Sequence, residues 1–243
     1  MYASYNGITL PPQGVAVNGL YVFKSVPTFT SSSLNTTALN SSKVNLYTFS
    51  ISADPKGDIS VKQLMFLVTI NDPNQTYPHL NNFTFFKGSA DYSSLVTIGE
   101  ILNNYNTSLV NSAIGIGEHT LVLTFNTEET IPAGTTQTYT LKADVANFIS
   151  STALGADSIS TSIPPDYDIS INNRYLRMVF TKIYGLSYAP TDISTTNYNL
   201  LWSDRAALAV YAHSDSNGSS TPDWYNGFLV QNFPLPSQAK TAK

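Results

Sequence analysis

Residues 43–53 read Lys43-Val44-Asn45-Leu46-Tyr47-Thr48-Phe49-Ser50-Ile51-Ser52-Ala53, and this stretch decides the fold class. Tyr47, Phe49, Ile51 and Ala53 share one face of an extended chain, while the hydroxyl residues between them point the other way. Strict alternation of apolar and polar residues is typical of a strand with one buried face. We therefore expect a half-buried β-strand here.

Further segments repeat this alternation and are rich in β-branched and aromatic residues. Their inward-facing positions are Leu64, Phe66, Val68 and Ile70; Leu121, Leu123 and Phe125; Tyr139, Leu141, Ala143 and Val145; Ile159, Thr161 and Ile163; Leu176, Met178 and Phe180. Turn sequences lie between strand-like runs at 54–58, 71–74 and 131–134, which leaves little room for crossover helices. The sequence therefore predicts an all-β antiparallel sandwich.

Two short segments show a weak helical period instead. Residues 204–212 are rich in alanine, and residues 94–104 carry apolar side chains at Leu95, Ile98, Ile101 and Leu102. We expect one to three helical turns in each. No stretch resembles a linker, so the predicted organisation is an extension at 1–18 followed by one sandwich at 19–243. The alternative division places a smaller lobe from about residue 164.

Composition indicates how the surface is solvated. The 243 residues are 42% hydrophobic and only 12% charged, whereas about a quarter of a soluble domain is usually charged. Ser, Thr and Asn together supply 78 residues, so uncharged hydroxyls and amides do most of the solvation. Cysteine is absent, which excludes disulfides and thiolate metal sites. This composition is typical of an exported protein and predicts an extracellular location.

Charge and hydropathy exclude two partners. The net charge is −4 without a basic cluster, so we expect no nucleic-acid partner. No apolar run approaches the roughly 18 to 20 residues that cross a bilayer, so we expect no membrane span. Residues 1–7 have neither a basic nor an apolar signal-peptide region, which predicts a processed chain or export without a cleaved signal.

The segment before the sandwich differs from the rest of the chain. Residues 1–18 cannot build a core alone, because their apolar positions are scattered and Pro11-Pro12 interrupts them. They can instead lie along a sheet edge as an added strand, on the same subunit or on a neighbour. The residues predicted to make such a subunit interface are Tyr5, Ile8, Leu10, Val15 and Val17.

Candidate catalytic residues are few. The chain has twelve aspartates, and its histidines and glutamates are His79, His119 and His213 with Glu100, Glu118, Glu128 and Glu129. No Gly-x-Ser-x-Gly motif occurs, and residues 114–118 lack the lysine of a phosphate-binding loop. Glu128 and Glu129 precede a turn, where a solvated loop explains them. We expect no enzyme activity and no cofactor.

Calcium is the one metal that the residues suggest. Asp215, Asn217 and Asp223 place oxygen ligands around a glycine turn, and Asp166 with Asp168 offers a second carboxylate pair. Neither group has the twelve-residue spacing of a calcium-binding loop with a closing glutamate. An Asx turn at a hairpin tip explains the first group equally simply.

Aromatic residues and sequons give two further expectations. Trp202 and Trp224 either flank a shared sugar-binding pocket or simply pack at the end of the sandwich. Possible N-glycosylation sites follow the Asn-x-Ser/Thr pattern at Asn35, Asn40, Asn74, Asn82, Asn106 and Asn217.

Two stretches resemble a known group of proteins. Residues 22–28 and 48–59 resemble the opening of secreted immunoglobulin-like β-sandwich proteins of candidate phyla radiation bacteria. The closing signature of these proteins resembles two later stretches, Leu201-Trp202-Ser203-Asp204 and Asp223-Trp224-Tyr225-Asn226-Gly227-Phe228-Leu229-Val230. Arg205 replaces a usual small polar residue, and residues 209–220 lengthen the link between the tryptophans. The resemblance implies an immunoglobulin-like fold and a cell-surface location, and no reaction.

The closing signature also has a physical interpretation. Asn226-Gly227 suits a type I′ turn or a bulged strand, and Asp204 and Asp223 suit the capping of backbone N–H groups. Structural roles are therefore expected for Trp202, Asp204, Asp223, Trp224, Asn226 and Gly227.

Two functions follow from these observations. The first is a structural subunit of a cell-surface filament or layer, assembled by β-strand addition between copies. The alternative is a monomeric carbohydrate-binding or adhesive module that uses exposed aromatic rings.

Overall fold

The structure is a computed structural model that describes residues 22–39, 43–102, 106–109, 113–166, 199–206, 213, 224–227 and 230–243, with the strand residues 4–5 and 8–9. The expected strand around 176–180 lies outside these residues, as does most of the expected helical segment 204–212. In the described part of the chain, no helix is long and apolar enough to cross a membrane.

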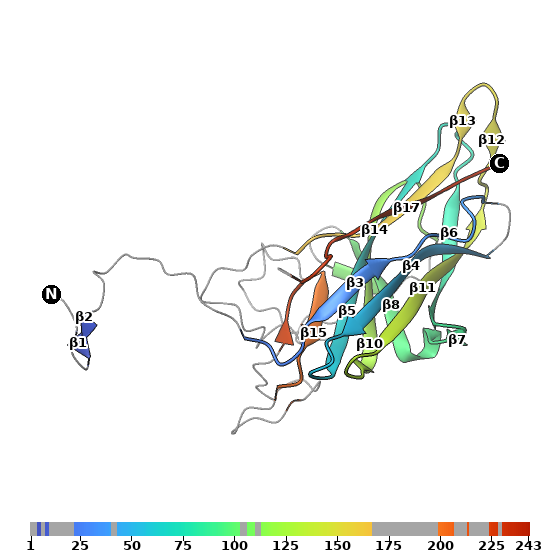
Figure 1. The fold of residues 1–243 in the computed structure, drawn as a ribbon. Helices are drawn as coiled ribbons and strands as arrows, with labels where there is room; N and C mark the ends of the chain where they lie inside the picture. The colour runs from blue at the N-terminus through green and yellow to red at the C-terminus, as the bar shows by residue number, and fades with distance from the viewer. Residues whose placement is uncertain are drawn as a thin grey trace.

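Two antiparallel sheets pack against each other, which confirms the predicted all-β sandwich (Figure 1). The first sheet has the order β3 (Pro27–Ser31), β4 (Lys43–Ala53), β11 (Thr136–Ala146), β6 (His79–Lys87) and β7 (Ala90–Asp91). The second follows the path β16 (Trp224–Tyr225), β15 (Leu200–Ser203), β5 (Ile59–Asn71), β10 (Gly117–Ile131), β8 (Val96–Leu102) and β9 (Asn106–Leu109), with β14 (Ser158–Ile163) and β17 (Leu235–Thr241) joined to it. A small hairpin pairs β12 (Ser150–Ser151) with β13 (Gly155–Ala156).

The core lies between the sheets and follows the predicted alternation. Phe49 and Ile51 of β4 are fully buried, as are Phe66 of β5 and Tyr139 of β11. The Phe49 ring lies 6.0 Å from Phe66 across the sandwich and 5.6 Å from its neighbour Tyr139. Burial of such rings, each worth roughly 1.5–3 kcal/mol, holds the two sheets together.

Strand β5 organises the second sheet. One of its edges pairs with β10, while β14 and β15 share the other edge end to end. Between those two strands, the backbone N–H of Met65 donates to the carbonyl of Asn199 at 2.8 Å. The chain thus leaves the sheet after β14 and returns at β15 in line with it.

The helical expectation for 94–104 is wrong. A single 3₁₀ turn, η1 (Ser93–Leu95), is followed at once by β8, which pairs with β10 from Val96 to Ile101. β-Branched residues at Val96, Thr97, Ile98 and Ile101 favour an extended chain, and pairing with β10 outweighs a weak local helical period.

β17 joins the two sheets at one side of the sandwich. The Gln238 amide acts like a strand backbone, because its Oε1 accepts from Thr48 N at 3.0 Å and its Nε2 donates to Thr48 O at 2.7 Å. On the other side of β17, Thr241 N donates to Thr37 O at 2.8 Å. These contacts occupy sheet edges that would otherwise be open.

Residues before the sandwich form a separate hairpin. β1 (Ser4–Tyr5) pairs with β2 (Ile8–Thr9), with Ser4 opposite Thr9 and Tyr5 opposite Ile8. The segment is therefore two short strands in this structure and not one extended strand. Leu10, Val15 and Val17 lie outside the described residues.

Candidate functional site

Trp202 packs in the core of the sandwich, whereas Trp224 is buried beside His213, with ring centroids 5.4 Å apart. Trp202 is 2% exposed and Trp224 is fully buried. β15 and β16 pair Trp202 with Tyr225, and the Trp202 indole N–H donates to the Asn226 carbonyl at 2.8 Å. The rings thus take the predicted structural position and leave no open face for a sugar.

The same residues hold the chain where the sandwich begins. Asp204, which is 2% exposed, accepts the backbone N–H of Lys24 at 2.9 Å and that of Ala206 at 3.1 Å. The Phe23 ring lies 5.3 Å from Trp202 and 4.9 Å from Tyr225. We call Phe23, Lys24, Trp202, Asp204 and Tyr225 the anchor. The predicted capping role of Asp204 is thereby located, whereas Asp223 lies outside the described residues.

Asp166 joins three distant segments beside the anchor. Its carboxylate accepts backbone N–H groups from Asn199 at 2.6 Å, Leu200 at 3.0 Å and Gly227 at 2.7 Å. Burial raises the pKa of Asp166 to about 6, although the three hydrogen bonds oppose this rise. This buried aspartate therefore clamps β14, β15 and the segment after β16 together. Its neighbour Asp168, suggested for calcium, is outside the described residues.

Gly227 is required by close packing. A Cβ at this position would lie 2.6 Å from the Phe233 ring and 2.7 Å from Asp166 Oδ2. Its φ is outside the left-handed region, and a type I′ turn needs positive φ at both central residues. The type I′ alternative for Asn226-Gly227 is therefore wrong. A glycine is needed at position 227 for the close contact with Phe233 and Asp166 instead.

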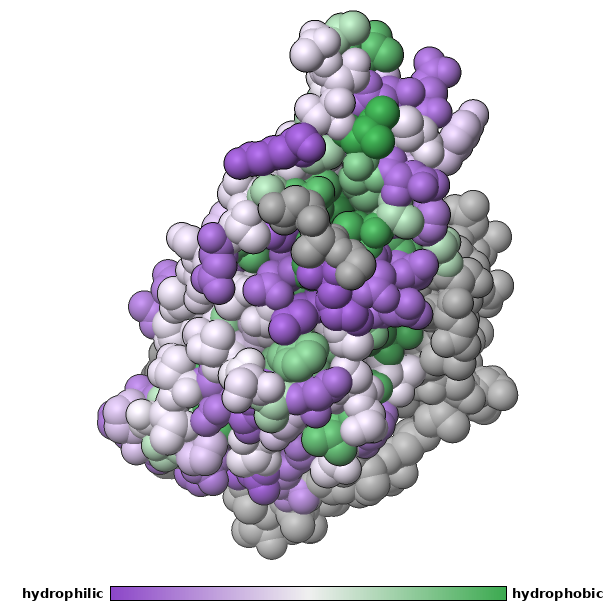
Figure 2. Space-filling model, turned by 90° about the vertical axis from the view of Figure 1, so that its right-hand side faces the viewer, coloured by the Kyte–Doolittle hydropathy of each residue, from purple (hydrophilic) through white to green (hydrophobic). Residues whose placement is uncertain are grey.

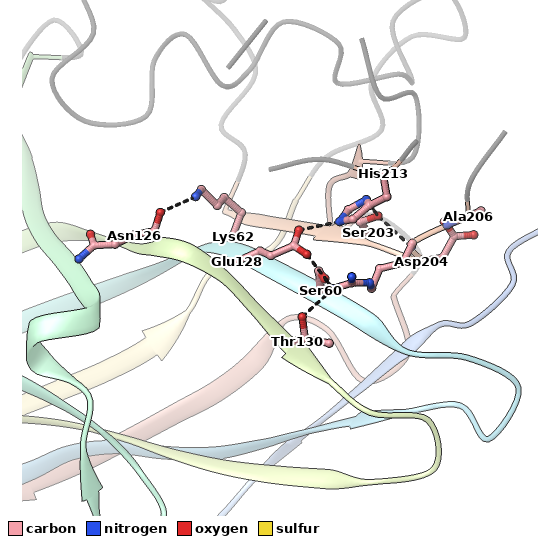
Figure 3. A network of polar contacts seen from close by, with 10 residues as sticks. Ser60, Lys62, Asn126, Glu128, Thr130, Ser203, Asp204, Ala206 and His213 are labelled. Carbon is pink, nitrogen blue, oxygen red and sulfur yellow. Dashed lines mark hydrogen bonds and ion pairs between the residues drawn. The ribbon is translucent and has the colours of Figure 1, made fainter. Parts of the chain in front are cut away.

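A polar cluster surrounds Glu128 at the surface of β10 (Figure 3). The Arg205 guanidinium donates to Glu128 Oε1 at 2.7 Å, Thr130 Oγ1 at 2.6 Å and Ser60 Oγ at 3.1 Å. His213 Nε2 lies 2.6 Å from the other Glu128 oxygen. Arg205 has a positive φ of 51° and links β15 to β5 and β10.

Ser203 contacts His213, and His213 contacts Glu128, which is the order of contacts in a serine-hydrolase triad. Ser203 Oγ lies 3.4 Å from His213 Nδ1. However, Ser203 is fully buried and its Oγ also accepts the backbone N–H of Arg205 at 2.9 Å, while Glu128 already binds the Arg205 cation. A nucleophile needs an exposed oxygen beside its base, so this geometry fits a structural network better.

Glu129 points into the opposite side of β10. It is 8% exposed, accepts the Tyr139 hydroxyl at 2.8 Å and pairs with Lys87 at 2.6 Å. Burial alone would lower the pKa of Lys87, but Glu129 raises it above its ordinary value. The expectation of a solvated loop for Glu128 and Glu129 is therefore wrong. Glu128 and Glu129 are consecutive residues of β10, so their side chains point to opposite faces of the sheet and meet separate partners.

Removing the Tyr139 hydroxyl should cost little. In Tyr139→Phe, Glu129 loses one donor but keeps Lys87, so we expect a loss of about 1–2 kcal/mol in unfolding free energy. Urea denaturation of the variant and the parent measures this difference. An unchanged midpoint would show that the hydroxyl contact is not formed in solution.

The remaining histidines lie on the sheets. His119 of β10 has Nδ1 at 2.5 Å from Glu100 and Nε2 at 3.0 Å from the Gly115 carbonyl. His79 opens β6, and its Nδ1 lies 3.4 Å from the Tyr77 carbonyl. The residues that the structure describes contain no group of three or more histidines and carboxylates able to hold a metal. The calcium candidates Asp215, Asn217 and Asp223 lie outside them.

Buried hydrogen bonds stiffen one tip of the molecule. Fully buried Asp157 accepts from Asn74 Nδ2 at 2.9 Å, Thr76 Oγ1 at 3.0 Å and Ile149 N at 2.8 Å. Burial raises the pKa of Asp157, but the hydrogen bonds together lower it by more, so the pKa of Asp157 lies below its ordinary value. Exposed Ile149 and Leu154 adjoin this network, and green residues mark the tip at the top of Figure 2.

The sequons differ in what their nitrogens contact. Asn74 Nδ2, the atom that would carry a glycan, donates to Asp157, and Asn82 Nδ2 donates to Asp144 at 2.8 Å. Asn35 is exposed on a bend. The side chains of Asn40, Asn106 and Asn217 lie outside the described residues. Among the described sequons, Asn35 is therefore the most accessible.

No protein-family model matches the chain, and no curated protein matches it. The anchor, the Asp166 clamp and the sheet edges are thus the observations from which a function is inferred.

Proposed function

We propose that this chain is an extracellular structural protein, a subunit of a cell-surface filament or layer whose copies join by β-strand addition. One observation supports this most. Among the described strands, β1 and β2 pair only with each other, while Phe23 and Lys24 just beyond them are fixed in the anchor. The described strands β1 and β2 thus have no partner in either sheet, and the chain is firmly held where the described sandwich begins.

Strand exchange costs this segment little. An isolated two-stranded hairpin is at best marginally stable in water, and this one has only two residue pairs. Adding the segment to the sheet of a neighbour would form more main-chain hydrogen bonds. Side chains at alternate positions, such as Ile8 and Leu10, would fill pockets on the receiving sheet.

The edges of the sandwich limit where such a strand can be received. β3 is covered at Phe29, whose N–H donates to the Gln231 carbonyl at 3.3 Å, and β17 is covered by Thr37. β9 is the terminal strand at one end of the second sheet. The other terminal strands, β7 and β16, have only two residues each, whereas β9 has four. Within the proposal, β9 is therefore the receiving edge, and head-to-tail addition that does not close generates an open polymer.

The surface chemistry is compatible with this role. Only 12% of residues are charged, and Ser, Thr and Asn provide most of the polar surface. The face in Figure 2 is accordingly a mixture of purple and white residues with small green patches. The resemblance to secreted sandwich proteins of candidate phyla radiation bacteria supports an extracellular location in the same proposal.

Deletion of residues 1–18 tests the proposal. We expect the full chain to form polymers visible by negative-stain electron microscopy and the deleted chain to stay monomeric. Because the anchor begins at Phe23, the deletion should leave the thermal melt unchanged, which controls for misfolding. Polymers of the deleted chain, or a monomeric full chain at high concentration, would contradict strand addition.

The alternative, a monomeric glycan-binding or adhesive module, has less support in the described residues. Trp202 and Trp224 are buried, and Tyr77, at 72% exposed, is the aromatic side chain most open to solvent there. A monomeric chain whose glycan binding is lost in Tyr77→Ala would replace the polymer proposal.

A further inference from the structure

The outer face of the first sheet carries an ordered array of hydroxyl groups. Inward-facing Phe29, Phe49 and Tyr139 are fully buried, so the residues between them face outward. On the strands β3, β4 and β11 these outward residues are Thr28, Thr30, Thr48, Ser50, Ser52, Thr136, Thr138 and Thr140, which we call the hydroxyl face.

Strand register aligns these residues into rows. Ser52 lies opposite both Thr28 and Thr136, and Ser50 lies opposite both Thr30 and Thr138. The hydroxyls of Ser52 and Thr136 are 2.7 Å apart and those of Ser50 and Thr138 2.8 Å. Thr48 and Thr140 continue the array at 3.3 Å. Cross-strand pairing thus satisfies part of the hydrogen-bonding capacity of the face within its own sheet.

Charge is absent from the hydroxyl face and begins at its border. The β4–β11 ladder shifts register between Leu141 and Lys142. Beyond that bulge, Lys142 lies 3.8 Å over the Phe86 ring and Lys43 pairs with Asp144 at 3.3 Å. Soluble proteins usually place charges on exposed sheet faces to oppose association. Burying paired neutral hydroxyls costs much less than burying charges.

These observations favour a second copy of the chain over a sugar. The hydroxyl face itself contains no aromatic ring for a sugar to stack on, and the ring at its border, Phe86 opposite Thr140, has the Lys142 ammonium 3.8 Å over it. It is neutral in a chain of net charge −4, so two copies can approach here with less repulsion than at a charged surface. In a two-fold contact the same patch is used by both copies, so a neutral face can pack against its own equivalent.

From this we infer that the hydroxyl face is the lateral contact between neighbouring polymers, packed against the same face of a second copy. This inference rests on the proposed strand-linked polymer. Three strands about 4.8 Å apart and a five-residue length at about 3.4 Å per residue give roughly 250 Å² per copy. A stable dimer needs about 800 Å² per partner. Free copies therefore do not dimerise through this face, but a polymer repeats the contact many times and gains avidity.

The absence of cysteine allows a direct test by cross-linking. Thr138→Cys gives the full chain a single thiol at an exposed position within the hydroxyl face, and Ser94→Cys gives a matched exposed thiol on η1. We expect a short bis-maleimide to link Thr138→Cys copies into dimers in polymer samples at least tenfold more than Ser94→Cys copies. Thr30→Lys should abolish lateral bundles in electron micrographs while single polymers persist.

The outcomes separate this inference from the proposed function. Polymers that bundle unchanged in Thr30→Lys, with equal cross-linking at both thiols, would overturn the lateral contact and leave strand addition intact. A chain that never polymerises would contradict strand addition and would overturn the lateral contact with it, because free copies are not expected to dimerise through this face. A glycan would replace the second copy as the occupant of the hydroxyl face if the parent protein bound a neutral polysaccharide, Thr30→Lys abolished this binding, and Thr138→Cys cross-linked no more than Ser94→Cys.

Discussion

Gly227→Ala will lose about 2–3 kcal/mol of unfolding free energy. The added methyl would lie 2.6 Å from a ring carbon of Phe233 and 2.7 Å from Asp166 Oδ2, closer than real Cβ contacts come. Forcing atoms into a packed site costs typically 1–3 kcal/mol, and here the shift also strains the hydrogen bond from Gly227 N to Asp166. Urea denaturation monitored by tryptophan fluorescence measures the loss.

Gly115→Ala is the matched control for this variant. A Cβ at Gly115 meets nothing within 4 Å, and its φ is not in the left-handed region. We expect its denaturation midpoint to stay within experimental error of the parent. Equal losses in both variants would show that the close contact around Gly227 is not the cause.

Asp166 should make stability depend on pH between about 4 and 6. Burial raises the pKa of Asp166 from 3.8 to about 6, so the folded state binds the proton more strongly than the unfolded state. The stabilisation is complete below pH 3.8 and is lost as the pH rises through 6. A difference of about two pKa units corresponds to about 3 kcal/mol.

The comparison of Asp166→Asn with the parent isolates this effect. Other carboxyl groups titrate in both chains, so we expect the parent's advantage over the variant to fall by about 2 kcal/mol from pH 4 to pH 7, most of the full effect. Urea denaturation at several pH values measures this. A constant difference across that range would mean that Asp166 does not titrate with a raised pKa.

Local sequence pattern was sufficient for the strands that form the core. Apolar alternation from Tyr47 to Ala53 names the buried face of β4 correctly, because a half-buried strand imposes a period of two. The same reasoning failed for 94–104, where a weak local period gave a helix and pairing with β10 gives a strand. The β-branched residues of this segment were the local signal for a strand, but they do not reveal which strand it will pair with.

The contacts near the anchor were predictable only in part. Asp204 was expected to cap backbone N–H groups, and it does so. Asp166 was considered only as a calcium ligand, since nothing in its neighbours indicates that Asn199, Leu200 and Gly227 will donate to it. Glu129 likewise read as a loop residue because its partners Lys87 and Tyr139 lie on other strands.

The position of β17 has a consequence for how the molecule is made. Gln238 binds Thr48, and Thr241 binds Thr37. The hydrogen bonds that cover these edges of the two sheets therefore join residues about two hundred positions apart in the chain. During synthesis, the backbone of β14 and of the region around Thr48 stays uncovered until residue 241 has been made. Loop closure over such a span is slow. A chain truncated before β17 would expose open sheet edges and would be prone to aggregate instead of forming a shorter stable protein.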